Sequence, residues 1–183
     1  MSRIAPLAEP WPAWFADAMT RVMPPGVAPL ALFRALATSE RAWDKFSSGS
    51  LIDKGPLPLR AREIVIDRTT ARCGCSYEWG IHIALFAERA GLTAAQVEDT
   101  AADSIDPSLW SDDERALLVT VDALIDRKLL GTSEFDGLRS HFSHAQILEI
   151  VQLVGFYHGV ALICGALDLP PEPGMPILPS KGV

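Results

Sequence analysis

The 183 residues of this chain include 23 acidic and 16 basic side chains, which give a formal net charge of −7 and a pI near 5.0. With that charge and no cluster of lysine and arginine, the sequence argues against a nucleic-acid binder and against binding to an anionic membrane surface. Apolar residues make up 49% of the chain, too many for a disordered protein, and the length fits a single domain spanning residues 1–183.

The expected elements are all helices, and no stretch has a convincing strand pattern. Apolar residues from Trp14 to Val22 predict a short amphipathic helix that ends at the Pro-Pro-Gly of 24–26. Pro29 suits the first turn of a second helix, whose apolar face runs over 30–37. Residues 47–57 contain serine, glycine and proline, and they predict a flexible loop.

The next two helices are separated by a short break. Pro58 opens a helix that is expected to end near Arg72, with Gly74 marking the break. A following helix carries Cys75 and should run to Ala90. Three capping boxes then predict further helix starts: Thr93 with Gln96, Ser111 with Glu114, and Ser143 with Gln146. Residues 133–142 suggest one more short helix.

The last helix is apolar nearly all round, which is typical of a helix central in a bundle or buried between subunits. The apolar stretch 145–169 also contains Glu149 and His158, so it predicts a buried helix rather than a membrane span. The segment 170–183 holds five prolines and should be an extended tail. Three cysteines form a poor disulfide framework, and residues 1–12 lack the apolar core of a signal peptide. We expect a soluble, cytoplasmic protein.

One cluster of residues stands out for its chemistry. Cys75, Glu78 and His82 are spaced i, i+3 and i+7, so on a helix all three project from one face. Glu63 lies twelve residues before Cys75, on the preceding predicted helix. A thiol, an imidazole and two carboxylates can therefore converge on one pocket, where they can relay protons and supply one nucleophile.

Each of these residues also has a plain structural role open to it. Glu63 can be a solvated glutamate near a helix start instead of a proton relay. Cys75 can be a reactive thiolate near a helix N-terminus or an inert small hydrophobic residue. A disulfide between Cys73 and Cys75 would be short, strained and easily reduced. For His82, a catalytic role is favoured because the residue shares one helix face with Cys75 and Glu78.

The same side chains are chemically adequate for zinc, but no His-Glu-x-x-His or paired Cys-x-x-Cys pattern is present. We therefore predict no metal and no cofactor. Tyr77 and Trp79 are candidates for lining a pocket that takes a flat, hydrophobic substrate, although core packing suits Trp79 as well. An arginine can hold a substrate carboxylate, and the candidates are Arg62, Arg68 and Arg72.

The stretch Pro-Leu-Arg-Ala-Arg-Glu-Ile-Val-Ile at 58–66, followed by Tyr-Glu-Trp-Gly-Ile-His at 77–82, resembles the carboxymuconolactone decarboxylase family, which also contains the alkylhydroperoxidase-D peroxidases. The resemblance covers roughly residues 30–168. It implies an all-α, alkylhydroperoxidase-D-like helical bundle built from antiparallel helical hairpins that assembles into a homo-oligomer. It also implies a pocket lined by the helices of Glu63 and His82.

The chain departs from the peroxidases of that family at one position. Those proteins carry Cys-x-x-Cys-x-x-x-His, and the match places Cys75 on the first cysteine and Glu63 on an acidic position upstream. Glu78 then stands where the peroxidases have the cysteine that attacks the peroxide. The chain therefore resembles the decarboxylase-like, Tyr-Glu-Trp branch more closely.

The resemblance and the residues together predict a cofactor-free enzyme acting on a small carboxylated or lactone metabolite. His82 would be the general acid and base, Glu63 the proton relay, and Glu78 the orienting carboxylate or a second acid. A thiol-dependent hydroperoxide reductase working through Cys75 is the alternative. A helical oligomer that binds a ligand without turning it over is a third hypothesis.

Overall fold

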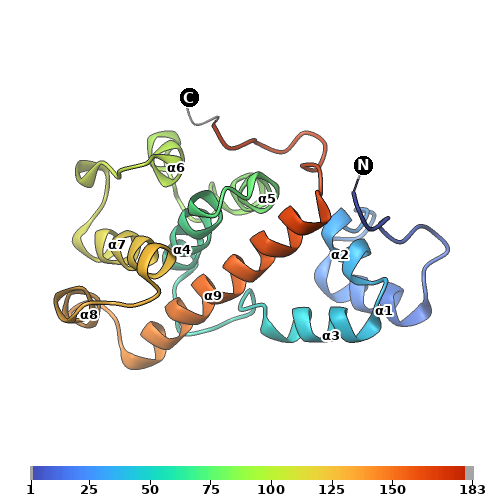
Figure 1. Cartoon of the computed structure of the whole chain (residues 1–183), viewed down its shortest axis with the longest axis horizontal. Helices are drawn as coiled ribbons and strands as arrows, with labels where there is room; N and C mark the ends of the chain where they lie inside the picture. Colours follow the sequence, from blue (N-terminus) through green and yellow to red (C-terminus); the bar gives the residue numbers. More distant parts are fainter. Residues whose placement is uncertain (1, 180–183) are drawn as a thin grey trace.

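The computed structural model describes residues 2–179, and over this range the chain is helical with no strand, as predicted (Figure 1). The elements are α1 (Ala13–Val22), α2 (Ala31–Leu36), α3 (Glu40–Gly49), α4 (Leu59–Arg72), α5 (Ser76–Phe86), α6 (Ala94–Ala101), the 3-10 turn η1 (Pro107–Leu109), α7 (Asp112–Arg127), α8 (Thr132–Arg139) and α9 (His144–Leu167).

Helix α9 runs across the molecule, with α4–α8 on one side of it and α1–α3 on the other (Figure 1). Helix α4 is the centre of the larger group, because it packs against α5, α6, α7 and α9. Its apolar residues Ile64, Val65 and Ile66 are all 0% exposed. A helix enclosed on so many sides gives its polar side chains fixed positions and little water.

The predicted capping boxes are confirmed at α6 and α9, where the side-chain and backbone bonds are present in both directions. At α7 the Ser111 amide donates to Glu114 at 3.1 Å, while the Ser111 hydroxyl donates to Asp113 instead of capping the helix. Helix α5 begins at Ser76, with Cys75 as the preceding capping residue, and it ends at Phe86 rather than at the predicted Ala90. The chain from 87 to 91 forms a further turn, which Gly91 closes at φ +67°.

The predicted loop over 47–57 is wrong at its start, because α3 continues to Gly49. Ser39 caps this helix by accepting a hydrogen bond from the amide of Ala42. Aromatic packing explains its length, since Phe46 contacts the ring of Phe156 on α9 with centroids 5.3 Å apart. Packing across 110 residues of sequence is invisible to a local pattern of serine and glycine.

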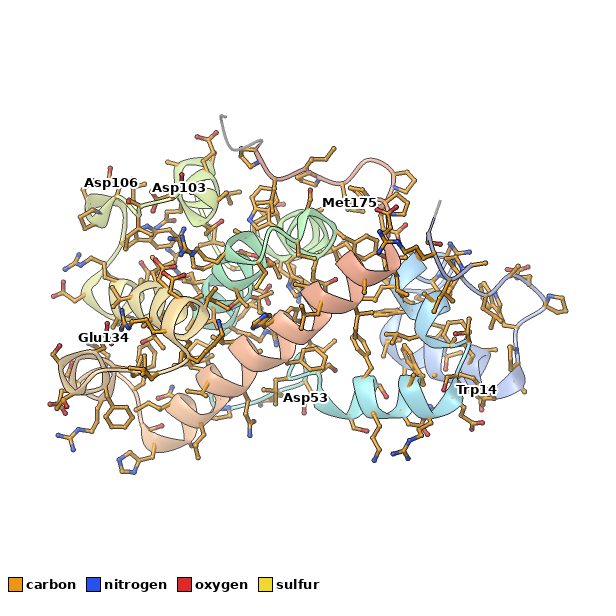
Figure 2. All side chains as sticks on the ribbon, in the orientation of Figure 1. Trp14, Asp53, Asp103, Asp106, Glu134 and Met175 are labelled. Carbon is orange, nitrogen blue, oxygen red and sulfur yellow. The ribbon has the colours of Figure 1, made fainter. Side chains whose placement is uncertain are left out.

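The C-terminal segment has no helix over residues 170–179, as predicted, and the rest of the tail lies outside the described residues. Its Glu172 accepts hydrogen bonds from the Tyr77 hydroxyl at 2.6 Å and from the Ala31 amide at 2.5 Å. Met175 lies over Gly80 of α5, where the nearby Pro176 carbonyl leaves no room for a side chain (Figure 2). The tail therefore fastens α5 to the start of α2.

Helix α9 does not bury its whole apolar surface. Leu148 and Leu162 are each 65% exposed and Val151 is 40% exposed, while Ile150, Leu153 and Tyr157 face the core. By length and composition, α9 is the one helix among the described residues that could cross a membrane, a test that core helices of soluble proteins also pass.

Candidate active site

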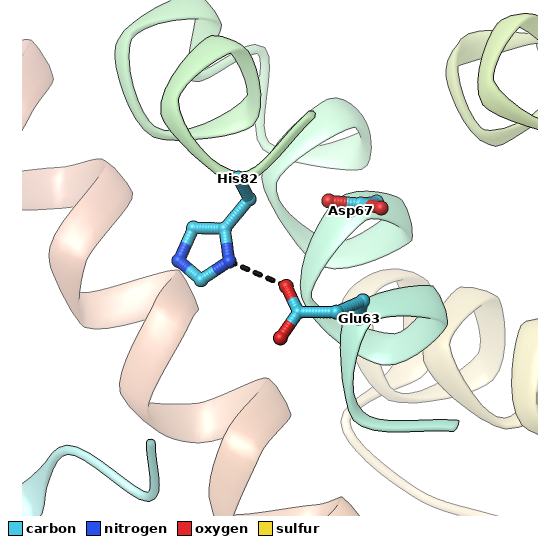
Figure 3. A group of neighbouring side chains, drawn as sticks. All are labelled: Glu63, Asp67 and His82. Atoms are coloured by element: carbon cyan, nitrogen blue, oxygen red, sulfur yellow. Dashed lines mark hydrogen bonds and ion pairs between the residues drawn. The ribbon is translucent and has the colours of Figure 1, made fainter. Parts of the chain in front are cut away.

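Helices α4 and α5 bring three ionisable side chains together in the interior (Figure 3). Glu63 and Asp67 lie one turn apart on α4, and His82 extends towards them from α5. Their exposed fractions are 0%, 1% and 4%. The short connection between the helices contains Gly74 at φ +66°, a left-handed conformation that suits glycine and turns α5 back onto α4.

One side of the His82 ring is held firmly. Its Nδ1 donates a hydrogen bond to Glu63 Oε2 at 2.7 Å. The other oxygen of Glu63 accepts from Arg62 Nε at 3.0 Å, so both carboxylate oxygens are occupied. This arrangement fixes the orientation of the imidazole, as the sequence predicted a carboxylate would do, but Glu63 makes the close contact where Glu78 was expected.

The other side of the ring is held loosely. Nε2 lies 3.5 Å from Glu78 Oε1, longer than a good hydrogen bond. The second oxygen of Glu78, Oε2, is buried and has no hydrogen-bond partner within the described part of the chain. His82 thus stands between two carboxylates with one tight and one slack contact, and Nε2 is the atom with freedom to serve a substrate.

Burial alone would lower the pKa of His82, but the hydrogen bond to Glu63 and the nearby carboxylate of Glu78 outweigh it and raise the pKa from 6.5 to about 10. The ring is therefore a cation at neutral pH and carries a proton on each nitrogen. A buried imidazolium flanked by carboxylates is suited to donate a proton and to recover it.

This pKa shift predicts how stability depends on pH. Because the folded pKa lies above the unfolded value, the stabilisation is complete below pH 6.5 and is lost as the pH rises towards about 10. We expect the free energy of unfolding to fall over that interval by an amount on the order of a few kcal/mol. Urea titrations across the interval measure it, and His82→Gln should flatten the slope. An equal slope in wild type and variant would contradict the assignment.

Asp67 is a member of the site that the sequence analysis missed. Neither of its carboxyl oxygens has a hydrogen-bond partner among the residues described. Burial raises the pKa of Asp67 well above its usual range, although the nearby His82 opposes the shift. The sequence did contain a sign of this role. Asp67 follows three apolar residues and lies one helical turn after Glu63, and this spacing puts the two side chains on one face of a helix.

Aromatic rings line the rest of the His82 environment. The ring of Tyr157 on α9 meets the imidazole edge-on, with centroids 5.1 Å apart, and the Phe86 ring lies 5.3 Å away. Burial, reinforced by the charges of Glu78 and Glu63, raises the pKa of Tyr157, so its hydroxyl stays neutral. These walls exclude water from the charged group, which strengthens its electrostatic interactions. Sequence reasoning assigned no role to Tyr157.

Cys75 is directed to a partner on α9. All three cysteines are free thiols, and the Cys75 thiol is hydrogen-bonded to Cys164. That bond lowers the pKa of Cys75, against the opposing effect of burial, and it raises the pKa of Cys164. The sequence analysis had considered only Cys73 as a partner of Cys75.

Tyr77 and Trp79, the predicted substrate-binding residues, both make structural contacts. The Tyr77 hydroxyl joins α2 to the tail, and Trp79 Nε1 donates to Thr100 Oγ1 at 3.1 Å. Among the three candidate arginines, Arg62 is the one beside His82 and Glu63, as it bonds to Glu63. The other two pair with acids of α7: Arg68 with Asp122, and Arg72 with Asp126.

Comparison with known proteins bears on the family and the fold of the chain. A family model described as the carboxymuconolactone decarboxylase family matches residues 37–122, which include Glu63, Cys75, Glu78 and His82. Comparison with curated proteins finds no match.

Several solved structures share the fold. An uncharacterized peroxidase-related protein from Silicibacter sp. TM1040 is 17% identical, with a TM-score of 0.75 over 93% of each chain. A protein of unknown function from Agrobacterium tumefaciens, described as a putative antioxidant defence protein AhpD, is 21% identical, with a TM-score of 0.67 over 74% of this chain and 93% of its own. The debrominase Bmp8, in complex with 2,3,4-tribromopyrrole, is 16% identical, with a TM-score of 0.70 over 94% of this chain and 93% of its own.

Proposed function

Because the chain belongs to the carboxymuconolactone decarboxylase and AhpD-like superfamily, we propose that it is a lyase that removes carbon dioxide from a small carboxylated or lactone substrate without a cofactor. The observation that carries this proposal is the position of His82, which Glu63 holds at Nδ1 while Nε2 has only a slack contact to Glu78. An imidazolium held in this way is a general acid with one proton ready to transfer.

The reaction needs one proton for each carbon dioxide released. The bond between the substrate carbon and its carboxylate breaks, and the electron pair passes into a neighbouring carbonyl group as an enolate. Nε2 of His82 then gives its proton to the carbon that has lost the carboxylate, which restores the carbonyl group. Glu63 stabilises the ring through Nδ1. Glu78, which has one oxygen without a hydrogen-bond partner among the described residues, would return a proton from solvent to Nε2.

The test is a panel of carboxylated lactones and β-keto acids, with carbon dioxide release as the readout. We expect turnover of at least one member by the wild type and loss of that turnover in Glu63→Gln. Glu88→Gln, an exposed acid just beyond α5, is the matched control and should keep full activity. A ligand that binds tightly but yields no carbon dioxide would instead favour the non-catalytic ligand-binding oligomer.

A thiol peroxidase is the second candidate, favoured by the hydrogen bond between Cys75 and Cys164 and by the lowered pKa of Cys75. The Cys75 thiolate would attack a hydroperoxide, break its O–O bond and release an alcohol, leaving a sulfenic acid. Cys164 would then condense with it, losing water and forming a disulfide that an external thiol reduces. Free thiols also suit a reducing compartment, and we propose a cytoplasmic location.

Mass spectrometry after a brief exposure to cumene hydroperoxide separates the two candidates. A peroxidase would lose two hydrogens per chain in the wild type, and Cys164→Ser would leave a sulfenic acid that a trapping reagent captures on Cys75. A decarboxylase would show an unreactive Cys75, and Cys75→Ser would leave its carbon dioxide release unchanged.

We also propose that the chain forms a homo-oligomer through the exposed apolar face of α9, defined by Leu148, Val151 and Leu162. Large apolar side chains exposed on one long helix are a feature of protein interaction surfaces. Leu162→Glu places a charge on that face and should convert the oligomer to a monomer in light scattering. Leu129→Glu, at a site 56% exposed between α7 and α8, should leave the mass unchanged. A monomeric wild type would refute the proposal.

A further inference from the structure

Asp67 lacks the partner that a buried carboxylate requires. The side chain is 1% exposed, and both of its oxygens are without a hydrogen bond among the described residues. Placing an unpaired carboxylate in the interior is strongly unfavourable, so such groups pair with a cation or coordinate a metal. The nearby cationic group, His82, already gives Nδ1 to Glu63.

The surrounding donors have the arrangement of a ligand set. Glu63, Asp67 and His82 each offer one ligand atom, and these atoms all lie within 4.8 Å of one another (Figure 3). An ion at bond lengths of about 2.1 Å can touch all three after small rotations of the side chains. We propose that these three residues bind one divalent first-row transition-metal ion, such as Mn²⁺ or Co²⁺.

The outer contacts of these ligands support the proposal. Glu63 turns one oxygen to Arg62, which leaves the other directed at His82. His82 turns Nε2 towards Glu78, which leaves Nδ1 facing the cluster. A metal-binding histidine commonly directs its second nitrogen at a carboxylate, and a metal-binding carboxylate is itself hydrogen-bonded. The support that such a site needs is therefore present on both ligands.

Charge and ligand type set the class of ion. With an ion bound and their protons displaced, the carboxylates of Glu63, Asp67 and Glu78 would bring three negative charges, and Arg62 brings one positive charge. A divalent ion bound to a neutral His82 makes the sum of these charges zero. Two oxygens and one imidazole nitrogen, with no thiolate, suit manganese, iron or cobalt better than a soft ion such as copper(I).

This site does not rest on the proposed lyase function. At Nδ1 of His82, a bound ion and the proton shared with Glu63 exclude each other. An ion there would hold the acid and base pair in a resting form, and its binding can be measured without any substrate.

The test uses the full chain, stripped with a chelator and titrated with Mn²⁺ or Co²⁺ by calorimetry, with the visible spectrum of cobalt as a second readout. We expect one ion per chain. Asp67→Asn, which keeps the size of the side chain, should weaken binding at least tenfold, and Glu78→Gln should weaken it about tenfold to a hundredfold. Glu88→Gln, which changes an exposed acid, should bind like the wild type.

Three results would overturn the inference. They are a wild type that takes up neither ion, an Asp67→Asn variant that binds as tightly as the wild type, and a sulfur-to-cobalt charge-transfer band that places the ion on cysteine. Circular dichroism checks that Asp67→Asn is folded. If it is not, Glu63→Gln replaces it in the same titration, and the wild-type stoichiometry and spectrum still decide.

Discussion

Replacing His82 by alanine should lower the turnover of a carboxylated substrate by about two to four orders of magnitude. The change removes the proton donor, and no other described side chain combines an imidazole with the contacts to Glu63 and Glu78. Alanine is a strong helix former, so α5 should persist, and Glu63 keeps its bond to Arg62. The measurement is kcat together with circular dichroism of the purified variant.

A second histidine serves as the control for this experiment. His141 is exposed near the end of α8, far in sequence from α4 and α5, and His141→Ala should keep wild-type turnover. If His82→Ala turned over a confirmed substrate at the wild-type rate, His82 would not be the acid. The proposed reaction would then need another donor, and Tyr157 would be the first to examine.

Replacing Arg68 by methionine should destabilise the fold by about 3–5 kcal/mol. Its side chain is 0% exposed, and it donates to both oxygens of Asp122 at 2.8 Å. It also donates to the carbonyl oxygens of Thr100 and Ala102, at 3.0 and 2.6 Å. Methionine fills the space but leaves these acceptors without a donor, and urea denaturation measures the loss.

The surface pair of Arg127 and Glu134 provides the comparison, with Glu134 on α8 labelled in Figure 2. Arg127 is 50% exposed, and its Nη2 donates to both carboxylate oxygens of Glu134 at 2.6 Å. Because water screens this pair, Arg127→Met should cost no more than about 1 kcal/mol. Equal losses at the two positions would show that burial does not decide the strength of these pairs. Arg68→Met should keep wild-type turnover per folded molecule, since Arg68 does not reach His82.

The sequence by itself determined the features that depend on neighbours along the chain. Capping boxes, helix periodicity and the proline-rich tail are local, so the helices at 94–101, 112–127 and 144–167 and the extended end follow from residues a few positions apart. The pairing of Glu78 with His82 is local too, because one helical turn separates them. Even Glu63 was placed correctly near His82, through the family resemblance.

Only the tertiary structure decided the features that depend on distant segments. The length of α3 follows from Phe46 meeting Phe156, and Cys75 finds its partner 89 positions away in Cys164. The isolation of Asp67 appears only when α5, α7 and α9 close around α4. Whether its carboxyl group has a hydrogen-bond partner depends on every side chain that these helices bring near it. A sequence pattern records which side chains share a face of one helix, and packing between helices decides what that face meets.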